Sequence, residues 1–560
     1  MMIMMMKRVI NDNDSRTYDR LIEDKERRSK GQFYTPKLFA DYAHKMISEA
    51  LGDNWKDEYV VWDNCCGTKN LTRDYRFKEL YCSTLENAEL EISKKYNPEA
   101  VSFQFDFLND TIAGRDSLSG VYDDKLPKGL KDALLENKPI VFLLNPPYGK
   151  SGGIVKGGHN KTIKETAIND LMKKDGYGFS SAMLEIQFLY RLIKIKEKYN
   201  LSNCYICLIN KTTYLSGPYF TQLRNDLYNN FGFINGCELD GSIFNNVGEC
   251  GISFIIWKSN YNNKNVVLDL LNTNNEYLQI FKKKIVYDTD NLKTLTDYAK
   301  FGFSKNKISV PSIKSPLNIT NAEKCVPANF IGWYFSHSND IYQSQQMIGI
   351  LNSFVHQGWA VTPENYENCC CAFSARRLIK CEFYNDKDQF LYPNTKHQNY
   401  KSFVNDSIIF SLFNDKSNTA SLRNIACNNK LWNIKNEFFW MSKSEIESLA
   451  NKYNNDDCYN DAHNSRDRFV YEKLQTITLS PEAKAVLDKA SDIVRNTFKY
   501  RELFNQEHPE YQINNWDCGW YQIKALCKKY MPEELKEFKE IYKKLADKMR
   551  PMVYELGFLK

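Results

Sequence analysis

Short apolar runs alternate with amphipathic segments over the first 260 residues of the chain. A strand that is buried on both faces is a continuous apolar run, whereas a helix covering a sheet repeats apolar positions every three or four residues. The alternation therefore predicts an α/β fold, built on a doubly wound, mostly parallel sheet. The predicted strands are 60–63, 80–83, 101–105, 140–144, 204–209, 233–239 and 252–257, and a crossover helix is predicted over 182–199.

Two polar stretches rich in asparagine, 260–265 and 451–464, interrupt the rest of the chain. They divide it into a first domain over 1–260, an α+β region over 261–475 and a helical segment over 476–560. In the last segment Ser480 and Pro481 are a typical N-cap and first helical residue. A second helix is predicted after Pro532, with apolar residues at helical spacing.

Charge and cysteine content narrow the classes of protein only slightly. A net charge of +6 over 560 residues permits a polyanionic partner but does not require one. The 16 cysteines are scattered, and the C-x-x-C pair of Cys204 and Cys207 has no second pair at zinc-ribbon spacing. No secretory signal precedes them. We therefore expect free thiols, no bound metal and a cytoplasmic location. No run of about 18 apolar residues occurs, so we expect no membrane span.

The segment Asn145-Pro146-Pro147-Tyr148-Gly149 follows the predicted strand 140–144. Open α/β sheets bind their ligands at the carboxyl ends of strands. The two prolines fix φ and remove two N–H donors, which leaves a stiff corner that displays carbonyl oxygens. An amide side chain begins this corner and an aromatic ring ends it. Such a corner can accept hydrogen bonds from a planar amino group, such as the N6 of adenine, and stack on the ring that bears it.

This corner resembles the catalytic tetrapeptide of S-adenosylmethionine-dependent amino-methyltransferases. Two segments before it, 31–36 and 62–71, appear in the order found in the γ class of N6-adenine DNA methyltransferases. The second segment is similar to the family pattern D-P-A-C-G-S-G-N. It matches that pattern at Asp63, Cys66, Gly67 and Asn70, and departs from it at Asn64, Cys65 and Lys69. The resemblance covers roughly residues 31–257.

The resemblance implies S-adenosylmethionine as the cofactor and assigns residues to it. A helix that begins with Thr35 as N-cap and Pro36 as first helical residue is expected to bind the methionine carboxylate. In the family an acidic residue binds the ribose, and strict register aligns that position with Thr84 of this chain. We instead assign the role to Glu86, two residues later. The assigned cofactor-binding residues are Thr35, Asp63, Cys65, Gly67, Glu86, Asp106 and Phe107.

The resemblance also implies direct methyl transfer to an adenine in double-stranded DNA. The Asn145 side chain and the Pro146 carbonyl would accept hydrogen bonds from N6, at a corner stiffened by Pro147. Tyr148 and Phe244 would hold the flipped base between their rings.

A restriction-modification system of a bacterial or phage-infected cell is the expected setting. We find no PD-(D/E)xK nuclease motif. We therefore expect an enzyme that acts alone or beside a separate restriction endonuclease. We also expect it to be a monomer. A target-recognition region is expected after the first domain, with a basic cluster at Arg376, Arg377 and Lys380.

Two alternatives stay open. Some RNA and protein-amide methyltransferases use the same corner, so the motif identifies the chemistry better than the acceptor. Lys69 stands where the family has a glycine that permits close approach or positive φ. This departure motivates the second alternative, a non-catalytic DNA-binding protein on a decayed methyltransferase scaffold.

Overall fold

The protein is described here from a computed structural model. The described residues are 34–111, 125–151, 165–244, 250–273, 276–287, 292–300, 307–315, 318–336, 347–352, 357–385, 389–453, 466–514 and 516–560. The chain divides into two compact units, Met1–Asn291 and Leu292–Lys560, and each is described by itself. The three-part division expected from the sequence stays a prediction.

The first unit is built on a nine-stranded sheet with the strand order β3-β2-β1-β4-β5-β7-β6-β8-β9. The first five strands along the chain pair in parallel, and β7 runs antiparallel to both of its neighbours. All seven expected strands are present, and the expected doubly wound, mostly parallel sheet is confirmed. The strands are β1 (Val60–Asp63), β2 (Leu80–Thr84), β3 (Val101–Gln104), β4 (Ile140–Leu144), β5 (Cys204–Lys211), β6 (Phe231–Asp240), β7 (Gly251–Ser259), β8 (Val267–Thr273) and β9 (Leu278–Ile285).

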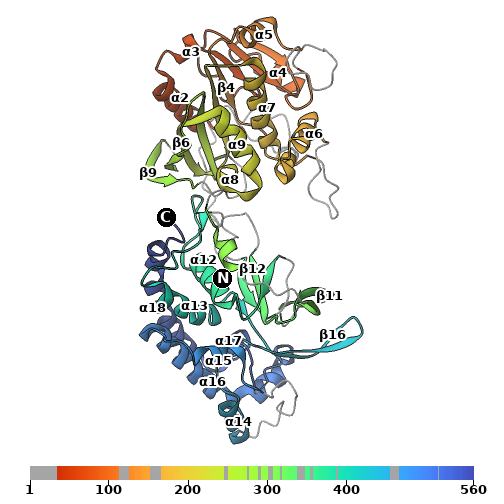
Figure 1. Cartoon of the computed structure of the whole chain (residues 1–560), viewed down its shortest axis with the longest axis vertical. Coiled ribbons are helices and arrows are strands. Elements are labelled where there is room, and N and C mark those ends of the chain that lie inside the picture. Colours follow the sequence, from red (N-terminus) through yellow and green to blue (C-terminus); the bar gives the residue numbers. More distant parts are fainter. Residues whose placement is uncertain are drawn as a thin grey trace. The chain divides into compact units, whose positions relative to one another are not determined.

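Helices cover both faces of this sheet (Figure 1). They are α2 (Lys37–Leu51), α3 (Trp55–Glu58), α4 (Asn87–Ser93), α5 (Lys128–Leu135), α6 (Ala167–Lys174), α7 (Leu184–Tyr199), α8 (Thr213–Ser216) and α9 (Thr221–Asn230), with short 3-10 turns at η2 (Gly178–Ala182), η3 (Pro218–Phe220) and η4 (Gly241–Phe244). Strand β4 is apolar at every position because both of its faces are buried. Ile140, Phe142 and Leu144 pack with α5, α6, α7 and α9 on one face. Val141 and Leu143 pack with α2 on the other face.

The second unit combines a four-stranded sheet, two hairpins and a set of helices packed around one apolar core. Its strands are β10 (Lys307–Ser315), β11 (Asn318–Pro327), β12 (Gly332–Ser336), β13 (Ile348–Leu351), β14 (Gly358–Val361), β15 (Ser417–Asn418), β16 (Leu422–Cys427) and β17 (Lys430–Ile434). Its helices are α10 (Leu295–Ala299), α12 (Tyr366–Leu378), α13 (Tyr400–Leu412), α14 (Lys443–Lys452), α15 (Phe469–Leu474), α16 (Pro481–Glu507), α17 (Trp520–Tyr530) and α18 (Pro532–Glu555), with a 3-10 turn at η7 (Pro509–Tyr511).

Both expected helices near the end of the chain are present as α16 and α18. Ser480 caps α16, since its hydroxyl accepts a hydrogen bond from the backbone N–H of Ala483 at 3.2 Å. Pro481 is the first helical residue, a position whose N–H has no partner within the helix, so a proline there loses no hydrogen bond. Within the described ranges, no helix is long and apolar enough to span a bilayer.

The expected basic cluster of Arg376, Arg377 and Lys380, at and just after the end of α12, does not form an exposed patch. Arg376 is buried and donates a hydrogen bond to the Ser336 hydroxyl at 3.0 Å. Lys380 is exposed, but its ammonium pairs with Glu382 at 2.5 Å. Because adjacent positions on a helix point in different directions, Arg376 points into the core of this unit rather than joining a basic surface.

Candidate active site

A cavity of about 350 Å³ opens at the carboxyl ends of β1, β2, β3 and β4. All seven residues assigned to the cofactor line it, namely Thr35, Asp63, Cys65, Gly67, Glu86, Asp106 and Phe107. From the proline corner, Asn145 and Pro147 also line it, whereas Pro146, Tyr148 and Phe244 do not. The fold thus brings motifs separated by more than 100 residues to a single cavity.

The cavity wall is acidic and apolar. Five carboxyl groups line it, and Lys, Arg and His do not occur among the described lining residues. Phosphate ligands are usually held by cationic side chains or glycine-rich loops, so this wall is unfavourable for a phosphate group and favourable for a cation. The carboxyl groups are those of Asp63, Glu86, Glu89, Asp106 and Glu165.

Asp63 ends β1, and its carboxyl group is buried. Burial raises the pKa of Asp63 from its ordinary 3.8 to about 7. The backbone N–H of Cys65, the ammonium of Lys69 and the hydroxyl of Thr72 offset part of this rise. None of these groups forms a hydrogen bond of normal geometry with either carboxylate oxygen. A buried carboxylate left in this state is expected to have a ligand as its partner.

The loop after β1 has a left-handed backbone conformation at two positions, which glycine usually permits. Gly67 has a φ of 49° and Lys69 a φ of 61°, both in the left-handed region. Lys69 therefore adopts a backbone conformation that is unfavourable for a residue with a Cβ. Its ammonium points away from the cavity and donates hydrogen bonds to the carbonyls of Tyr96, at 2.8 Å, and Asn97, at 3.5 Å. The departure from glycine thus leaves the turn in place, and two hydrogen bonds hold the lysine.

Thr35 joins the first motif to the proline corner. The expected N-cap role of Thr35 is wrong, because α2 begins one residue later, at Lys37, with Pro36 as N-cap. Instead the Thr35 hydroxyl accepts a hydrogen bond from the Asn145 side-chain N–H at 3.0 Å. The carbonyl end of the same amide accepts a bond from the Tyr148 hydroxyl at 3.2 Å. Both ends of the Asn145 side chain are thereby oriented.

Tyr148 lies beneath the corner in the core of the first unit. Besides its contact with Asn145, its hydroxyl lies 3.3 Å from the carbonyl of Ile209. The ammonium of Lys211 lies 5.3 Å from the centre of its ring. Burial, reinforced by the charge of Glu185, raises the pKa of Tyr148 well above its ordinary value. The hydroxyl therefore remains protonated and acts as a donor.

Glu185 stands beside the corner at the start of α7, where no sequence motif marks it. The chain of α7 holds the corner directly, since the N–H of Leu184 donates to the carbonyl of Gly149 at 3.0 Å. Burial raises the pKa of Glu185, and Lys211 and the N–H groups of Glu185 itself and Gly149 partly offset that rise. One of its carboxylate oxygens is buried and makes no hydrogen bond.

The loop after β3 forms the aromatic end of the cavity. The Asp106 carboxylate accepts bonds from the N–H of Leu108 at 3.0 Å and the Asn109 side chain at 2.8 Å, which fixes a turn. Phe107 stacks on Phe188 with ring centres 5.0 Å apart and planes 14° apart.

Phe188 and Arg191, both on α7, were missed because they look like ordinary core positions of a crossover helix. The Arg191 guanidinium is fully buried and donates to the backbone carbonyls of Phe107 and of Asp110, the latter at 2.7 Å. It therefore holds the aromatic loop against α7.

A second buried acid was also missed. Glu86, the residue chosen from the sequence, lies half-buried at the start of α4. Glu89, one turn into the same helix, is buried, and its carboxylate accepts a bond from the Thr84 hydroxyl at 2.6 Å. It also lies beside Gly67, with Oε1 3.7 Å from where a Cβ on that glycine would stand. The sequence does not distinguish Glu89 from a surface residue, because a glutamate in a helix that follows a strand is usually exposed.

Phe244 lies in the core and outside the cavity. It is 2% exposed and packs edge-on against Phe39 of α2, with ring centres 5.3 Å apart. It belongs to the same apolar cluster as Tyr148. Its assignment as a base-stacking residue stays a prediction.

The first seven strands in the sheet order form the doubly wound, Rossmann-like arrangement expected from the sequence, with β7 as the reversed strand. The chain matches no protein-family model and no curated protein sequence. Its solved structural neighbours include the methyltransferase subunit of a type I restriction-modification system from Streptococcus thermophilus, with 16% identity, a TM-score of 0.31, and coverage of 45% of this chain and 51% of that chain.

Two further neighbours are the DrdV–DNA complex and the type IIG restriction endonuclease BpuSI. The first has 16% identity and a TM-score of 0.31, and the match covers 44% of this chain and 28% of that chain. The second has 14% identity and a TM-score of 0.31, and covers 46% of this chain and 31% of that chain. The chain thus spans less than two thirds of the length of each of the three. At these identities and TM-scores the likenesses identify neither a family nor an activity.

Proposed function

We propose that this chain is a DNA methyltransferase that transfers a methyl group from S-adenosylmethionine to the N6 amino group of a flipped adenine. The observation that carries the proposal is the acidic cavity, which reaches the proline corner through Asn145 and Pro147. A cavity of about 350 Å³ is within the range that encloses a cofactor-sized molecule, roughly 300–1,000 Å³. Its wall of carboxyl groups and aromatic rings suits a ligand with positive charge, a ribose and a purine.

The lining residues fit the cationic part, the ribose and the purine of S-adenosylmethionine. The buried carboxylate of Asp63 suits the positive charge of the cofactor, because the two are attracted strongly where water is excluded. Glu89 and Glu86 suit the ribose hydroxyls, and Glu89 is the better placed because Thr84 fixes it inside the cavity. Phe107, stacked on Phe188, provides an apolar ring surface for the purine.

The proline corner has the acceptors that the reaction requires. The bound cofactor supplies an electrophilic methyl group on its sulfonium. The lone pair of an adenine amino nitrogen is delocalised into the ring, so acceptors that bind its hydrogens favour a pyramidal, reactive nitrogen. The Asn145 carbonyl oxygen already accepts from Tyr148 but has a second lone pair, and the Pro146 carbonyl is a second acceptor. These two groups stabilise positive charge as it develops on the nitrogen.

The choice of DNA as acceptor rests on the order of the motifs along the chain, which is that of the γ class. The base must leave the duplex, which costs a few kcal/mol, offset by stacking and edge contacts in the protein. We expect the enzyme to act as a monomer, alone or beside a separate restriction endonuclease.

The test is methyl transfer from radiolabelled S-adenosylmethionine to duplex DNA, RNA and protein, alongside calorimetric titration of the cofactor. We expect transfer to adenine-containing duplex. Asn145→Ala should lower the rate at least about 100-fold, the loss typical of removing one preorganised polar contact to the transition state, and should largely spare cofactor affinity.

The matched control is Asn263→Ala, because Asn263 also makes a side-chain bond, to the Phe233 carbonyl at 2.9 Å, at the start of β6. It should keep full activity. Transfer to RNA or protein alone would replace the DNA assignment. No detectable binding of S-adenosylmethionine would favour the second alternative, a non-catalytic DNA-binding protein on a decayed methyltransferase scaffold.

A further inference from the structure

Strands β16 and β17 form a two-stranded ribbon in the second unit, which Figure 1 shows extending from the body of the unit. Asn428 and Asn429 form its turn, with φ values of 50° and 60°. These left-handed values match the twist of a tight hairpin. Near the base, Leu422 and Ile425 pack with the ring of Trp432. A six-residue strand such as β16 spans about 20 Å.

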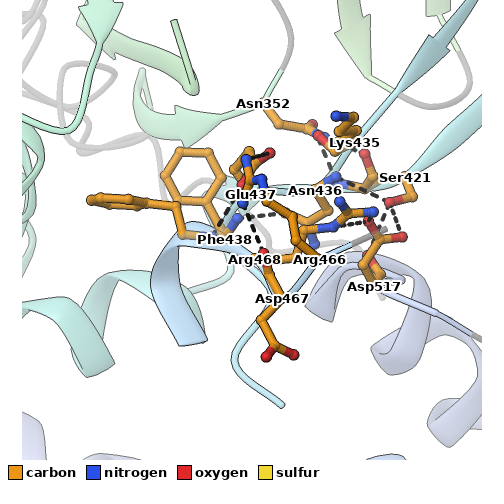
Figure 2. Close-up of polar contacts among 12 residues, drawn as sticks. Asn352, Ser421, Lys435, Asn436, Glu437, Phe438, Arg466, Asp467, Arg468 and Asp517 are labelled. Atoms are coloured by element: carbon orange, nitrogen blue, oxygen red, sulfur yellow. Dashed lines mark hydrogen bonds and ion pairs between the residues drawn. The ribbon is translucent and has the colours of Figure 1, made fainter. Parts of the chain in front are cut away.

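The base of the ribbon is held by a buried polar network (Figure 2). Ser421 and Asn436 flank the two strands, and the N–H of Asn436 donates to the Ser421 hydroxyl at 3.0 Å. That hydroxyl donates to Asp517, which also forms a fully buried ion pair with Arg468. Asn352 accepts a bond from the N–H of Ala420 at 3.2 Å and donates back to its carbonyl. The network fixes where both strands leave the core.

A buried ion pair of this kind contributes little net stability, because desolvation of the two charges offsets their attraction. Its geometric effect is larger, since each group has only one arrangement that satisfies the others. A second acid, Glu437, continues the network just after the ribbon. It accepts bonds from Arg466 at 3.0 Å and from the N–H of Phe469 at 3.0 Å. The ribbon is therefore mounted rigidly.

The surface of the ribbon is basic and rich in amides. Residues 421–436, which are the two strands with their flanking residues, contain Arg423, Lys430 and Lys435 and no Asp or Glu. Its exposed positions include the amides of Asn424, Asn428, Asn429 and Asn433. At the tip, Leu431 is 72% exposed, the highest value among the large apolar side chains of the described residues.

We propose that the β16–β17 ribbon enters a groove of duplex DNA and contacts base edges there. The inference rests on the proposed function, because it takes the DNA to be the methylation substrate. The major groove is about 12 Å wide and 8.5 Å deep and admits a two-stranded ribbon, and about 20 Å of strand reaches its floor. Amide side chains pair with adenine edges, and the basic residues neutralise phosphates. The exposed Leu431 then contacts base methyl groups or a base step.

One acid lies next to the ribbon. Glu323 of β11 accepts a hydrogen bond from Ser309 at 2.6 Å and lies near Asn428 and Lys430. A carboxylate there repels phosphates and competes for Lys430. Its replacement by glutamine is therefore expected to tighten DNA binding, the opposite of the effect of removing Lys430.

The test measures the affinity of the full chain for a fluorescent duplex at several salt concentrations. Three substitutions are combined, Arg423→Gln, Lys430→Gln and Lys435→Gln. Each lost phosphate contact lowers the slope of log K against log salt by about 0.9, so the triple variant should lose about 2.7. Affinity at 0.1 M salt then falls by up to roughly 500-fold.

A matched control removes the same charge from exposed lysines of α16 and α18, with Lys484→Gln, Lys499→Gln and Lys543→Gln. It should retain affinity and slope. Lys430→Gln and Leu431→Ser are tested singly, because both side chains are exposed and the fold does not depend on them. Thermal unfolding and titration with S-adenosylmethionine verify that every variant is folded.

The outcomes separate this inference from the proposed function. Loss of duplex binding in the ribbon variants alone supports the inference, even where no methyl transfer is detected. Methylation of DNA by the wild type with unchanged affinity in the ribbon variants overturns the inference and leaves the proposed function standing. An equal loss in the control triple, or a wild-type chain that binds no duplex, also overturns it.

Discussion

Asp63→Asn is expected to stabilise the protein without its cofactor and to weaken cofactor binding. The carboxyl group is buried, and its pKa is about 7 instead of 3.8. Between these two values the folded protein holds a proton that the unfolded chain has released. The free energy of unfolding therefore falls as the pH rises through this window, and levels off above about pH 7.

The magnitude follows from the difference between the two pKa values, roughly three units at about 1.4 kcal/mol each. Relative to a residue that does not titrate, Asp63 lowers the free energy of unfolding by about 4 kcal/mol at pH 8. The loss is about 2 kcal/mol at pH 5.5, where Asp63 is ionised in the unfolded chain and protonated in the fold. Asparagine has nearly the same shape and no proton to release. The stabilising effect of Asp63→Asn should thus be about 2 kcal/mol larger at pH 8 than at pH 5.5.

Urea unfolding of wild type and variant at both pH values measures this difference. All other titrating groups are common to the two proteins, so their contributions cancel at each pH. Calorimetry is the second readout. Wild-type affinity for S-adenosylmethionine should rise about tenfold per pH unit below pH 7, whereas the variant should bind weakly with little pH dependence.

Asp106→Asn is the matched control, because Asp106 lines the same cavity but is hydrogen-bonded by Leu108 and Asn109. It should weaken binding without stabilising the protein. A stability difference for Asp63→Asn that is equal at both pH values would refute the reasoning, since it would mean that the carboxylate is already compensated within the protein.

Three further predictions concern side chains around the same cavity. Glu89→Gln should weaken S-adenosylmethionine binding about 10- to 100-fold by calorimetry, whereas Glu86→Gln should change it by less than about threefold, because only Glu89 is buried and fixed by Thr84. The opposite ranking would restore Glu86 as the ribose acid. Lys69→Ala should lower the free energy of unfolding by about 2 kcal/mol, because the alanine keeps the left-handed strain and loses two hydrogen bonds. Lys69→Gly should be about 1 kcal/mol more stable than Lys69→Ala in urea unfolding, and equal stability of the two would show that the backbone there is unstrained. Arg191→Met should lower thermal stability by several degrees and weaken cofactor binding, since the carbonyls of Phe107 and Asp110 lose their donor; unchanged cofactor affinity would mean that the aromatic loop keeps its position without the arginine.

The elements of the first unit could be predicted because its core is simple. A strand such as β4, buried between two layers of helices, must be apolar at every position, and this pattern is visible without any structure. The start of α2 was harder to place. Thr35 and Pro36 have the residue types of a cap and a first helical residue, yet the Thr35 hydroxyl is used by Asn145, 110 residues away. Capping rules consider only residues that are neighbours in sequence, so they cannot predict a hydrogen bond to Asn145, which follows β4.

The residues that the sequence did not reveal share a physical cause. Glu89, Glu185, Phe188 and Arg191 all lie on helices that follow a strand or a loop of the cavity, and their roles depend on which way each helix turns its side chains. Helical periodicity predicts which face is buried, but not whether that face meets a core or a cavity. Lys69 shows the reverse case. Its residue type argued against the turn, yet the carbonyl oxygens of Tyr96 and Asn97, in the segment after α4, bind its ammonium and hold the strained backbone. Contacts made elsewhere in the fold thus keep a backbone turn that the residue type alone argues against.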